Sequence, residues 1–318
     1  MKVKLWGVRG SVPTPLTNDE YQNRINKILL HAFKKKISSA QDLPSFLENL
    51  PAELRSITGG NTTCVEVITE DNDRYILDGG TGIRELGYKM MEGDAGKGND
   101  DIKIFFTHTH WDHVQGIPFF IPIYIPGNKI HFYSPIQDLE ERLALQMEGR
   151  FFPAEFRSTA SVKNFTVLKN GEPLNFNNDL LVDFLPVQHP GGSNAYRFRQ
   201  NGKTFIFATD AEFTGEVLEH QNSAYDSFFQ NADVLIIDSQ YTLDDSFLKF
   251  DWGHTSYTMA VNCGAKWNIK KLILTHHEPS YLDDKLQENF EKALIHKDQL
   301  GSRLPEIYLA REGLEITV

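Results

Sequence analysis

Residues 108–113 read His-Thr-His-Trp-Asp-His, and they follow almost directly on an apolar run, Ile-Lys-Ile-Phe-Phe, at residues 102–106. The run has the β-branched and aromatic composition of a buried strand. Residues two apart at the end of a strand point the same way, so His108 and His110 can bind one metal ion. The aspartate and the third histidine follow where the chain must turn, within reach of a second ion. Imidazoles this crowded are compatible when a cation lies between them, so the stretch predicts a metal site.

Three further strand-like runs end close to a side chain that can bind a metal: His189, Asp210 and His276. Binding sites of α/β proteins lie at the ends of strands, so we expect these three side chains to converge on the first histidines. Asp78 also follows an apolar run. An aspartate in this position more often orients a histidine ligand through a hydrogen bond than binds the metal itself.

The overall composition limits the partners that the chain can have. It has 318 residues, of which 40% are hydrophobic, which suffices for a large core. Lys and Arg number 32 against 43 Asp and Glu, a formal net charge of −11. This balance disfavours an extended nucleic-acid surface, because such surfaces need many phosphate contacts. A small anionic substrate remains compatible, since bound cations would make the pocket locally positive.

The sequence also predicts a compartment. No apolar run approaches the roughly 20 residues that span a bilayer, and the N-terminus lacks the apolar segment of a secretory signal. Cys64 and Cys263 are far apart in apolar surroundings and are expected to be buried free thiols. Free thiols are typical of a reducing compartment, so we expect a cytoplasmic protein without membrane contact.

A helical pattern interrupts the strands at residues 15–57, where Asn18-Asp19-Glu20 offers a helix start. We interpret this segment as a helical insertion in a single domain that spans residues 1–318. Its role is open between a solvated cap, a lid and a dimer contact. Elsewhere, Asn-Gly at 201–202 predicts a β-hairpin, and Glu-Gly at 312–313 predicts a closing hairpin.

Together with His189, Asp210 and the Leu-Thr-His at 274–276, residues 108–113 resemble the metallo-β-lactamase superfamily. Three further stretches are similar to its phosphodiesterase branch: Gly-Gly-Asn-Thr-Thr-Cys at 59–64, Leu-Asp-Gly-Gly-Thr-Gly at 77–82 and Gly-His-Thr-Ser at 253–256. That branch includes the tRNA 3′-processing endonuclease and cyclic-nucleotide phosphodiesterases. The resemblance covers nearly the whole chain. It implies an α/β fold, an αββα sandwich in one domain, with a dinuclear metal site on one edge.

The resemblance also implies seven metal ligands. His108, His110 and His189 would hold one ion, Asp112, His113 and His276 would hold the other, and Asp210 would bridge the two. Imidazole and carboxylate ligands suit two zinc ions, with Mn²⁺ or Fe²⁺ as alternatives. His277 replaces His276 as the ligand if the register shifts by one residue.

The implied reaction is hydrolysis of a small or cyclic phosphodiester, with a cyclic nucleotide as one candidate. Two metal ions would ionise a shared water for attack on phosphorus. His254 would then protonate the leaving alkoxide, and Asp112 and Asp210 are predicted to be catalytic as well as metal-binding.

Two other activities stay open for this site. One is tRNA 3′-end cleavage, for which the sequence shows no obvious basic tRNA-binding arm. The other is hydrolysis of a lactone or thioester. By analogy with relatives, a homodimer is also left open as a partner arrangement.

Overall fold

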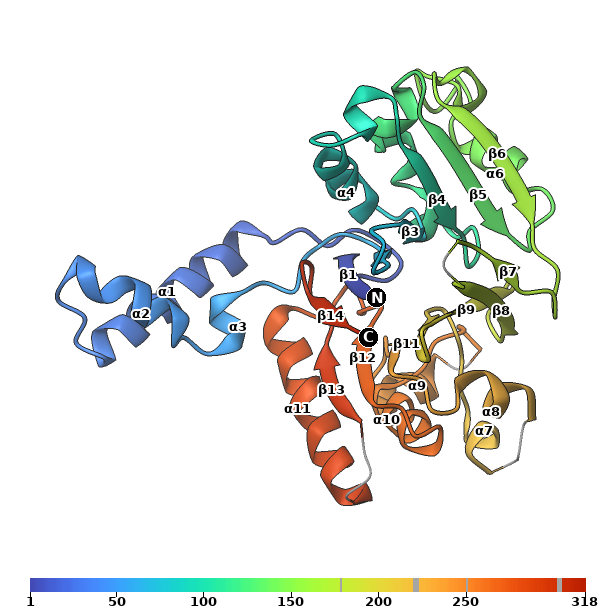
Figure 1. Cartoon of the computed structure of the whole chain (residues 1–318). Coiled ribbons are helices and arrows are strands. Elements are labelled where there is room, and N and C mark those ends of the chain that lie inside the picture. Colours follow the sequence, from blue (N-terminus) through green and yellow to red (C-terminus); the bar gives the residue numbers. More distant parts are fainter. Residues whose placement is uncertain (178, 220–222, 250, 302–304) are drawn as a thin grey trace.

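Two seven-stranded mixed sheets form the centre of the molecule (Figure 1), which is a computed structural model describing residues 1–318 except 178, 220–222, 250 and 302–304. In the first sheet the strands lie in the order β14 (Glu315–Thr317), β1 (Lys2–Gly7), β2 (Cys64–Ile68), β3 (Arg74–Leu77), β4 (Asp101–Phe105), β5 (Lys129–Ser134) and β6 (Val162–Val167). In the second sheet the order is β13 (Glu306–Leu309), β12 (Lys271–Thr275), β11 (Val234–Asp238), β10 (Lys203–Ala208), β9 (Ser193–Gln200), β8 (Leu181–Val187) and β7 (Leu174–Asn175). Each sheet is parallel in one half and antiparallel in the other.

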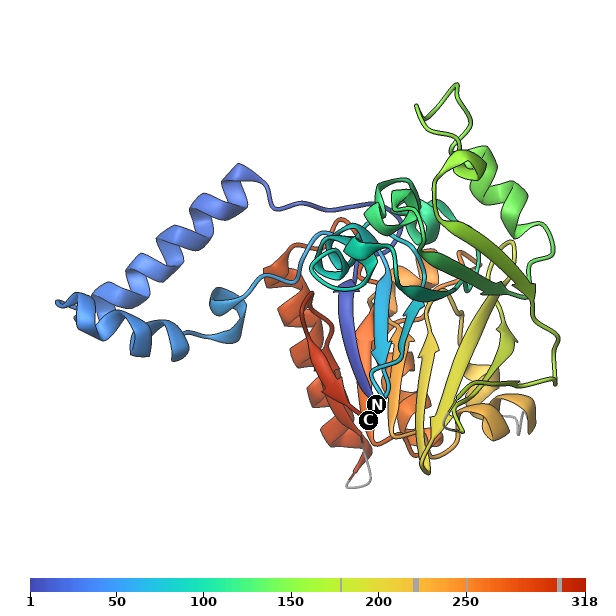
Figure 2. The same cartoon turned by 45° about the horizontal axis from the view of Figure 1, so that its top comes forward.

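Helices cover the outer face of both sheets. The first sheet carries α4 (Gly82–Met90), α5 (Trp111–Val114) and α6 (Leu139–Gln146), and the second carries α7 (Gly215–Glu219), α8 (Ser223–Phe229), α9 (Leu243–Leu248), α10 (Tyr257–Lys266) and α11 (Asp283–Leu300). Short 3-10 helices lie at Ala40–Asp42, Ala95–Lys97, Ile117–Phe119, Ile121–Tyr124 and Phe156–Ser158. The predicted αββα sandwich is therefore confirmed (Figure 2).

Three apolar clusters hold the layers together. The central cluster lies between the sheets and includes Phe105 and Phe207, while each outer cluster joins one sheet to its helices. Apolar side chains point to both faces of β4, with Phe105 in the central cluster and Ile104 in an outer one. Strands buried on both faces are near-continuous apolar runs, which is why the run at 102–106 could be recognised as a strand. Both cysteines are buried free thiols, as expected.

The C-terminal hairpin prediction is wrong. β13 pairs with β12 in the second sheet, whereas β14 pairs with β1 in the first, so the turn at 312–313 carries the chain from one sheet to the other. A turn signal fixes a local change of direction but not the partner of each strand. The hairpin predicted at 201–202 does form, between β9 and β10.

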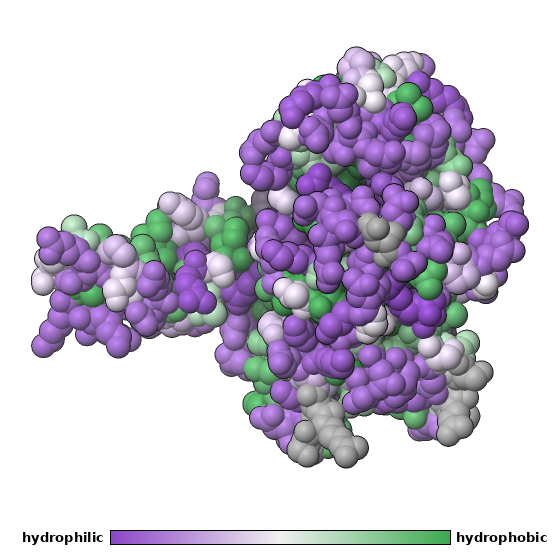
Figure 3. Space-filling model, viewed as in Figure 1, coloured by the Kyte–Doolittle hydropathy of each residue, from purple (hydrophilic) through white to green (hydrophobic). Residues whose placement is uncertain are grey.

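Residues 15–57 project from the sandwich as an arm built from α1 (Asn18–Lys34), α2 (Leu43–Glu48) and α3 (Ala52–Arg55) (Figures 1 and 2). Thr17 caps α1, and no residue of that helix is buried. Figure 3 shows apolar residues on this arm beside a largely hydrophilic body. Among the described residues, no helix combines the length and the apolar character that crossing a membrane requires.

Candidate metal centre

Four strands deliver the predicted ligands to one edge of the sandwich. His108 and His110 follow β4 of the first sheet, whereas His189, Asp210 and His276 follow β8, β10 and β12 of the second. The two sheets thus meet at the site, each contributing side chains to the same cluster. The remaining two residues predicted as ligands lie on α5, which begins directly after His110.

The first group of candidate ligands consists of His108, His110, His189 and Asp210, with one donor atom from each within 4.8 Å of the others. His189 Nε2 lies 3.0 Å from His110 Nδ1. The Nε2 atoms of His108 and His189 each lie 3.7 Å from Asp210 Oδ1. Three imidazole nitrogens and one carboxylate oxygen therefore face a common point.

The second group consists of Asp112, His113, His276 and Asp210. His113 Nε2 lies 2.9 Å from Asp210 Oδ2 and 3.4 Å from His276 Nε2. Asp112 Oδ2 lies 3.3 Å from His113 Nε2 and 3.1 Å from His276 Nε2. Tetrahedral ligands about 2.1 Å from a zinc ion are separated by roughly 3.4 Å, which these spacings approach. Because Asp210 faces one group with Oδ1 and the other with Oδ2, its carboxylate is placed to bridge two ions.

Two buried atoms test whether a cation fits this arrangement. Within the described part of the chain, His108 Nε2 and Asp210 Oδ2 have no hydrogen-bond partner. Asp210 Oδ2 lies close to His113 Nε2 without hydrogen-bond geometry. Buried polar atoms left unsatisfied are costly, typically by about 1–3 kcal/mol each. A divalent cation in the first group would satisfy His108 Nε2, and one in the second would satisfy Asp210 Oδ2, so the residues present fit a dinuclear metal site.

The pKa values divide the imidazoles into two sets. Burial, followed by neighbouring imidazoles in the case of His108, lowers the pKa of His108, His110 and His189. These rings are therefore neutral near pH 7, the form that binds metals. Burial alone would also lower the pKa of His113 and His276, but carboxylates, Asp210 foremost, raise the first well above its usual value and the second to about 9. The carboxylates that raise these two pKa values favour positive charge at the second group. A bound metal ion would supply that charge in place of the protons.

Neighbouring residues fix the orientation of the rings. Asp78 accepts hydrogen bonds from Thr107 N and Thr107 Oγ1 and lies 2.8 Å from His113 Nδ1, the orienting position expected from the sequence. His189 Nδ1 lies 2.9 Å from the carbonyl oxygen of Gly253. Gly253 has a φ of +85°, and a Cβ there would stand 2.2 Å from His189 Nδ1, so glycine is needed for this approach.

His276, rather than His277, lies in the cluster. The ring of His277 points elsewhere, with Nε2 donating to the carbonyl oxygen of Ala310 at 2.9 Å. Burial, followed by the charge of Arg9, lowers the pKa of His277 to about 3. His277 is therefore a neutral ring fixed in the interior, away from the candidate ligands.

His254 lies against the cluster, held by a residue that the sequence analysis missed. Its ring stacks on that of His276 at 5.0 Å between centroids and meets His189 edge-on at 5.2 Å. Asp238, fully buried at the end of β11, accepts a hydrogen bond from His254 Nδ1 at 2.8 Å. The signal for Asp238 was present, since it ends a buried strand, and Asp210 and His276 follow theirs within two residues. No histidine lies next to Asp238 in the sequence, so nothing there marked it as part of a site.

Comparison with known proteins identifies the family of the chain and supports its fold. Residues 73–277 match the family described as "Beta-lactamase superfamily domain". Ribonuclease Z of Prochlorococcus marinus (strain MIT 9301) is 24% identical over 311 residues, covering 81% of this chain and 94% of the relative. Among solved structures, the metallo-β-lactamase fold protein YhfI from Bacillus subtilis has a TM-score of 0.63 at 17% identity, covering 99% of this chain and 98% of the other. Zn²⁺-bound PqqB from Methylobacterium extorquens has a TM-score of 0.63 at 13% identity over the full length of both chains.

Proposed function

Because the chain belongs to the metallo-β-lactamase superfamily and carries the two His/Asp clusters of a metal-dependent hydrolase, we propose that it is a phosphodiesterase acting on a small phosphodiester. One observation carries the proposal above all. The two clusters share Asp210, and His254 stands beside them with its orientation set by Asp238. A phosphodiesterase needs groups that bind the phosphate and a separate proton donor for the leaving oxygen, and this arrangement offers both.

The seven clustered side chains are the proposed metal ligands. His108, His110 and His189 would hold one ion, Asp112, His113 and His276 would hold the second, and Asp210 would bridge them. Two zinc ions are the proposed occupants, and they would supply an acidified water and positive charge for the phosphoryl oxygens. Asp210 and Asp112 keep their carboxylates directed at this point through burial and through the rings around them. Ser11 N contributes by donating a hydrogen bond to Asp112 Oδ2 at 2.7 Å.

His254 is the proposed proton donor. Since the Asp238 carboxylate can only accept, His254 Nδ1 must donate to it, which directs Nε2 away from Asp238. The ring is almost enclosed, between His276 and His189, so a leaving oxygen at the cluster would be within its reach. We propose that Nε2 delivers a proton to that oxygen, while Asp238 stabilises the charged ring.

A small or cyclic diester, with a cyclic nucleotide as one candidate, is the favoured substrate. The formal net charge of −11 supports this choice over a long nucleic acid. The ribonuclease Z relatives favour a second candidate, tRNA 3′-end cleavage. Hydrolysis of a lactone or thioester is the alternative in which phosphorus is not attacked at all.

A substrate panel tests the proposal. Zinc-loaded protein would be incubated with 3′,5′- and 2′,3′-cyclic nucleotides, bis(p-nitrophenyl) phosphate, precursor tRNA, a thioester and a lactone. Cleavage of the small diesters with little cleavage of precursor tRNA is expected. Specific cleavage at the tRNA 3′ end would favour the second candidate. Turnover of thioester or lactone without any phosphodiester cleavage would refute the reaction class.

A further inference from the structure

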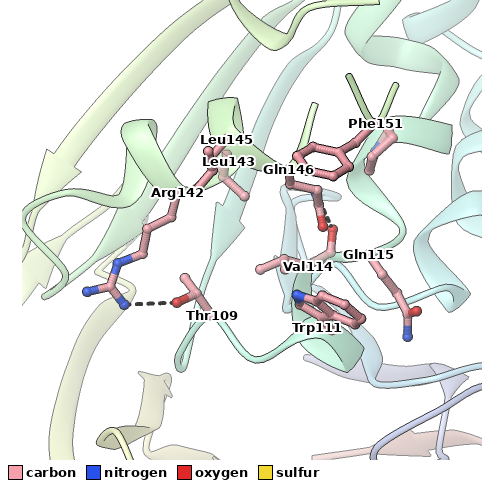
Figure 4. A pocket seen from close by; sticks show the side chains of 10 residues that line it. Thr109, Trp111, Val114, Gln115, Arg142, Leu143, Leu145, Gln146 and Phe151 are labelled. Atoms are coloured by element: carbon pink, nitrogen blue, oxygen red, sulfur yellow. Dashed lines mark hydrogen bonds between the residues drawn. The ribbon is translucent and has the colours of Figure 1, made fainter. Parts of the chain in front are cut away.

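An apolar pocket of about 600 Å³ lies beside the candidate metal centre (Figure 4). We call it the aromatic pocket, and its apolar lining consists of Trp111, Val114, Pro118, Leu143, Leu145 and Phe151. This volume lies within the range of small-molecule sites, about 300–1,000 Å³. None of these residues is part of the metal centre or of the proton-donor arrangement described above.

The pocket exposes large apolar side chains that soluble proteins normally bury. Trp111 is 82% exposed, Phe151 is 73% exposed and Leu145 is 63% exposed. Clustered exposure of this kind marks interaction sites, whereas isolated apolar residues on a surface need no explanation. In Figure 4 the rings of Trp111 and Phe151 lie on either side of Gln146 and Val114.

The pocket adjoins the segment that carries the first two histidines. Thr109 and Arg142 line it, and the same two residues line a second cavity that includes His108 and His110. Trp111 itself directly follows His110 in the chain. A molecule held at the histidines would therefore have the aromatic pocket beside it, across the hydrogen bond between Arg142 and Thr109.

Hydrogen bonds fix two sides of the pocket. Arg142 donates to Thr109 Oγ1 at 2.9 Å, and Gln146 donates to the carbonyl oxygen of Val114 at 3.0 Å (Figure 4). Both bonds join α6 to the segment that carries the histidines. Arg142 Nε also pairs with Asp138 Oδ1 at 3.0 Å, and its side chain lines both cavities. A lining held by such bonds reduces the reorganisation that binding costs.

We propose that the aromatic pocket binds a planar aromatic ring on an ester group of the substrate, and that Trp111 selects for it by stacking. The inference rests on the proposed phosphodiesterase function. Two aromatic side chains offer faces to a ring, and amides and a guanidinium at the rim can hydrogen-bond its polar edge. A flexible alkyl chain would use the apolar walls but not these polar groups. The pocket would therefore distinguish diesters by their organic part while the metal centre binds the phosphate.

Binding of phosphate monoesters to the zinc-loaded protein tests the inference without turnover. Adenosine 5′-monophosphate and ribose 5-phosphate share a phosphate and a sugar and differ in the base, and calorimetry would give the Kd of each. We expect the adenosine compound to bind more tightly. Trp111→Ala should weaken its binding by about 5- to 150-fold, the range found when a stacking aromatic is removed. The Kd for ribose 5-phosphate should stay within about twofold.

Two further variants separate stacking from damage to the metal centre. Phe151→Ala, which is distant in sequence from any candidate ligand, should also weaken the adenosine compound selectively. Phe33→Ala is the matched control, because Phe33 is an aromatic residue 84% exposed on the projecting arm. It should change neither Kd. Zinc content is measured for every variant. If Trp111→Ala retains two ions per chain, its Kd values test the inference. If it does not, the Kd values of Phe151→Ala test it instead.

Several results would overturn the inference. These are equal affinity for the two sugar phosphates, equal weakening of both by Trp111→Ala and Phe151→Ala, or tighter binding of octyl phosphate than of the adenosine compound. Turnover of bis(p-nitrophenyl) phosphate separates this inference from the proposed function. Cleavage of that diester without a preference for the base refutes only the aromatic pocket. A base preference without cleavage of any diester refutes the proposed function on which the inference rests.

Discussion

Replacing Asp238 with asparagine should reduce both the stability of the protein and its turnover. The buried carboxylate accepts four hydrogen bonds. Oδ2 accepts from Asp210 N at 3.0 Å and from His254 Nδ1 at 2.8 Å. Oδ1 accepts from Thr255 N at 2.9 Å and from Gln240 N at 3.2 Å.

The size of each loss follows from this geometry. An asparagine at position 238 has one oxygen, so two of the four donors would face an NH₂ group. Each unsatisfied buried donor costs about 1–3 kcal/mol, which gives about 2–6 kcal/mol of lost stability in total. The free energy of unfolding of a native protein is about 5–15 kcal/mol, so the variant should still fold. If His254 loses its acceptor, it is held in the wrong orientation or tautomer, and turnover should fall about 10²- to 10⁴-fold.

Denaturant unfolding, zinc content and kcat on a diester with an alkyl leaving group would measure these effects. Asp233→Asn is the matched control, because Asp233 is also buried and directly precedes the same strand at its opposite end. Asp233 accepts from Thr204 N at 2.9 Å and pairs with Lys270 Nζ at 2.8 Å. This variant should lose stability without losing zinc or kcat. Wild-type kcat in folded Asp238→Asn would refute the positioning role, and an equal loss of kcat in Asp233→Asn would show a general effect.

The contribution of Asp233 to the stability of the protein should depend on pH. Burial raises the pKa of Asp233, but hydrogen bonds from Lys270, Thr204 and Lys203 outweigh it and hold the pKa below its usual value. A depressed carboxyl pKa stabilises the folded state above the unfolded pKa, about 3.9, and this contribution is lost as pH falls through the folded pKa. The stability difference between wild type and Asp233→Asn should therefore be full near pH 7 and begin to shrink below about pH 4. A difference that is as large at pH 2 as at pH 7 would contradict this.

Three further predictions concern the metal centre. His254→Ala should retain zinc and lose about 10²- to 10⁴-fold in kcat with alkyl leaving groups but little with p-nitrophenolate, which leaves without a proton; equal losses would exclude proton donation. Gly10→Ala would place a Cβ 2.6 Å from the ring of His276, so a zinc titration should show one weakened site. Gly149→Ala is the control: a Cβ there has nothing within 4 Å, so this variant should bind zinc as the wild type does. Removal of zinc by a chelator should lower Tm, because an ion at 100 times its Kd contributes about 2.7 kcal/mol; a Tm unaffected by chelator and by zinc would count against metal binding.

The sequence predicted those parts of the fold that local composition determines. β4 and β12 are apolar runs flanked by polar residues, and their bounds could be recognised to within one residue without knowledge of their neighbours. β6 was not expected, because it is an edge strand with mostly exposed side chains and its residues alternate only weakly. Strand pairing also depends on long-range contacts, which is why the turn at 312–313 was misinterpreted as a hairpin.

The site also has a part that could be recognised from the sequence and a part that depends on long-range packing. Metal chemistry restricts ligands to few residue types, so His108, His189 and Asp210 stand out in the sequence even though they are far apart in it. The residues that surround an organic group are ordinary apolar ones. Trp111 lies on α5 and Phe151 lies 40 positions later in a turn after α6, and the packing of α6 brings them to one pocket. A motif can therefore indicate the reaction that a chain of this family performs, whereas its substrate depends on surfaces that only the folded chain assembles.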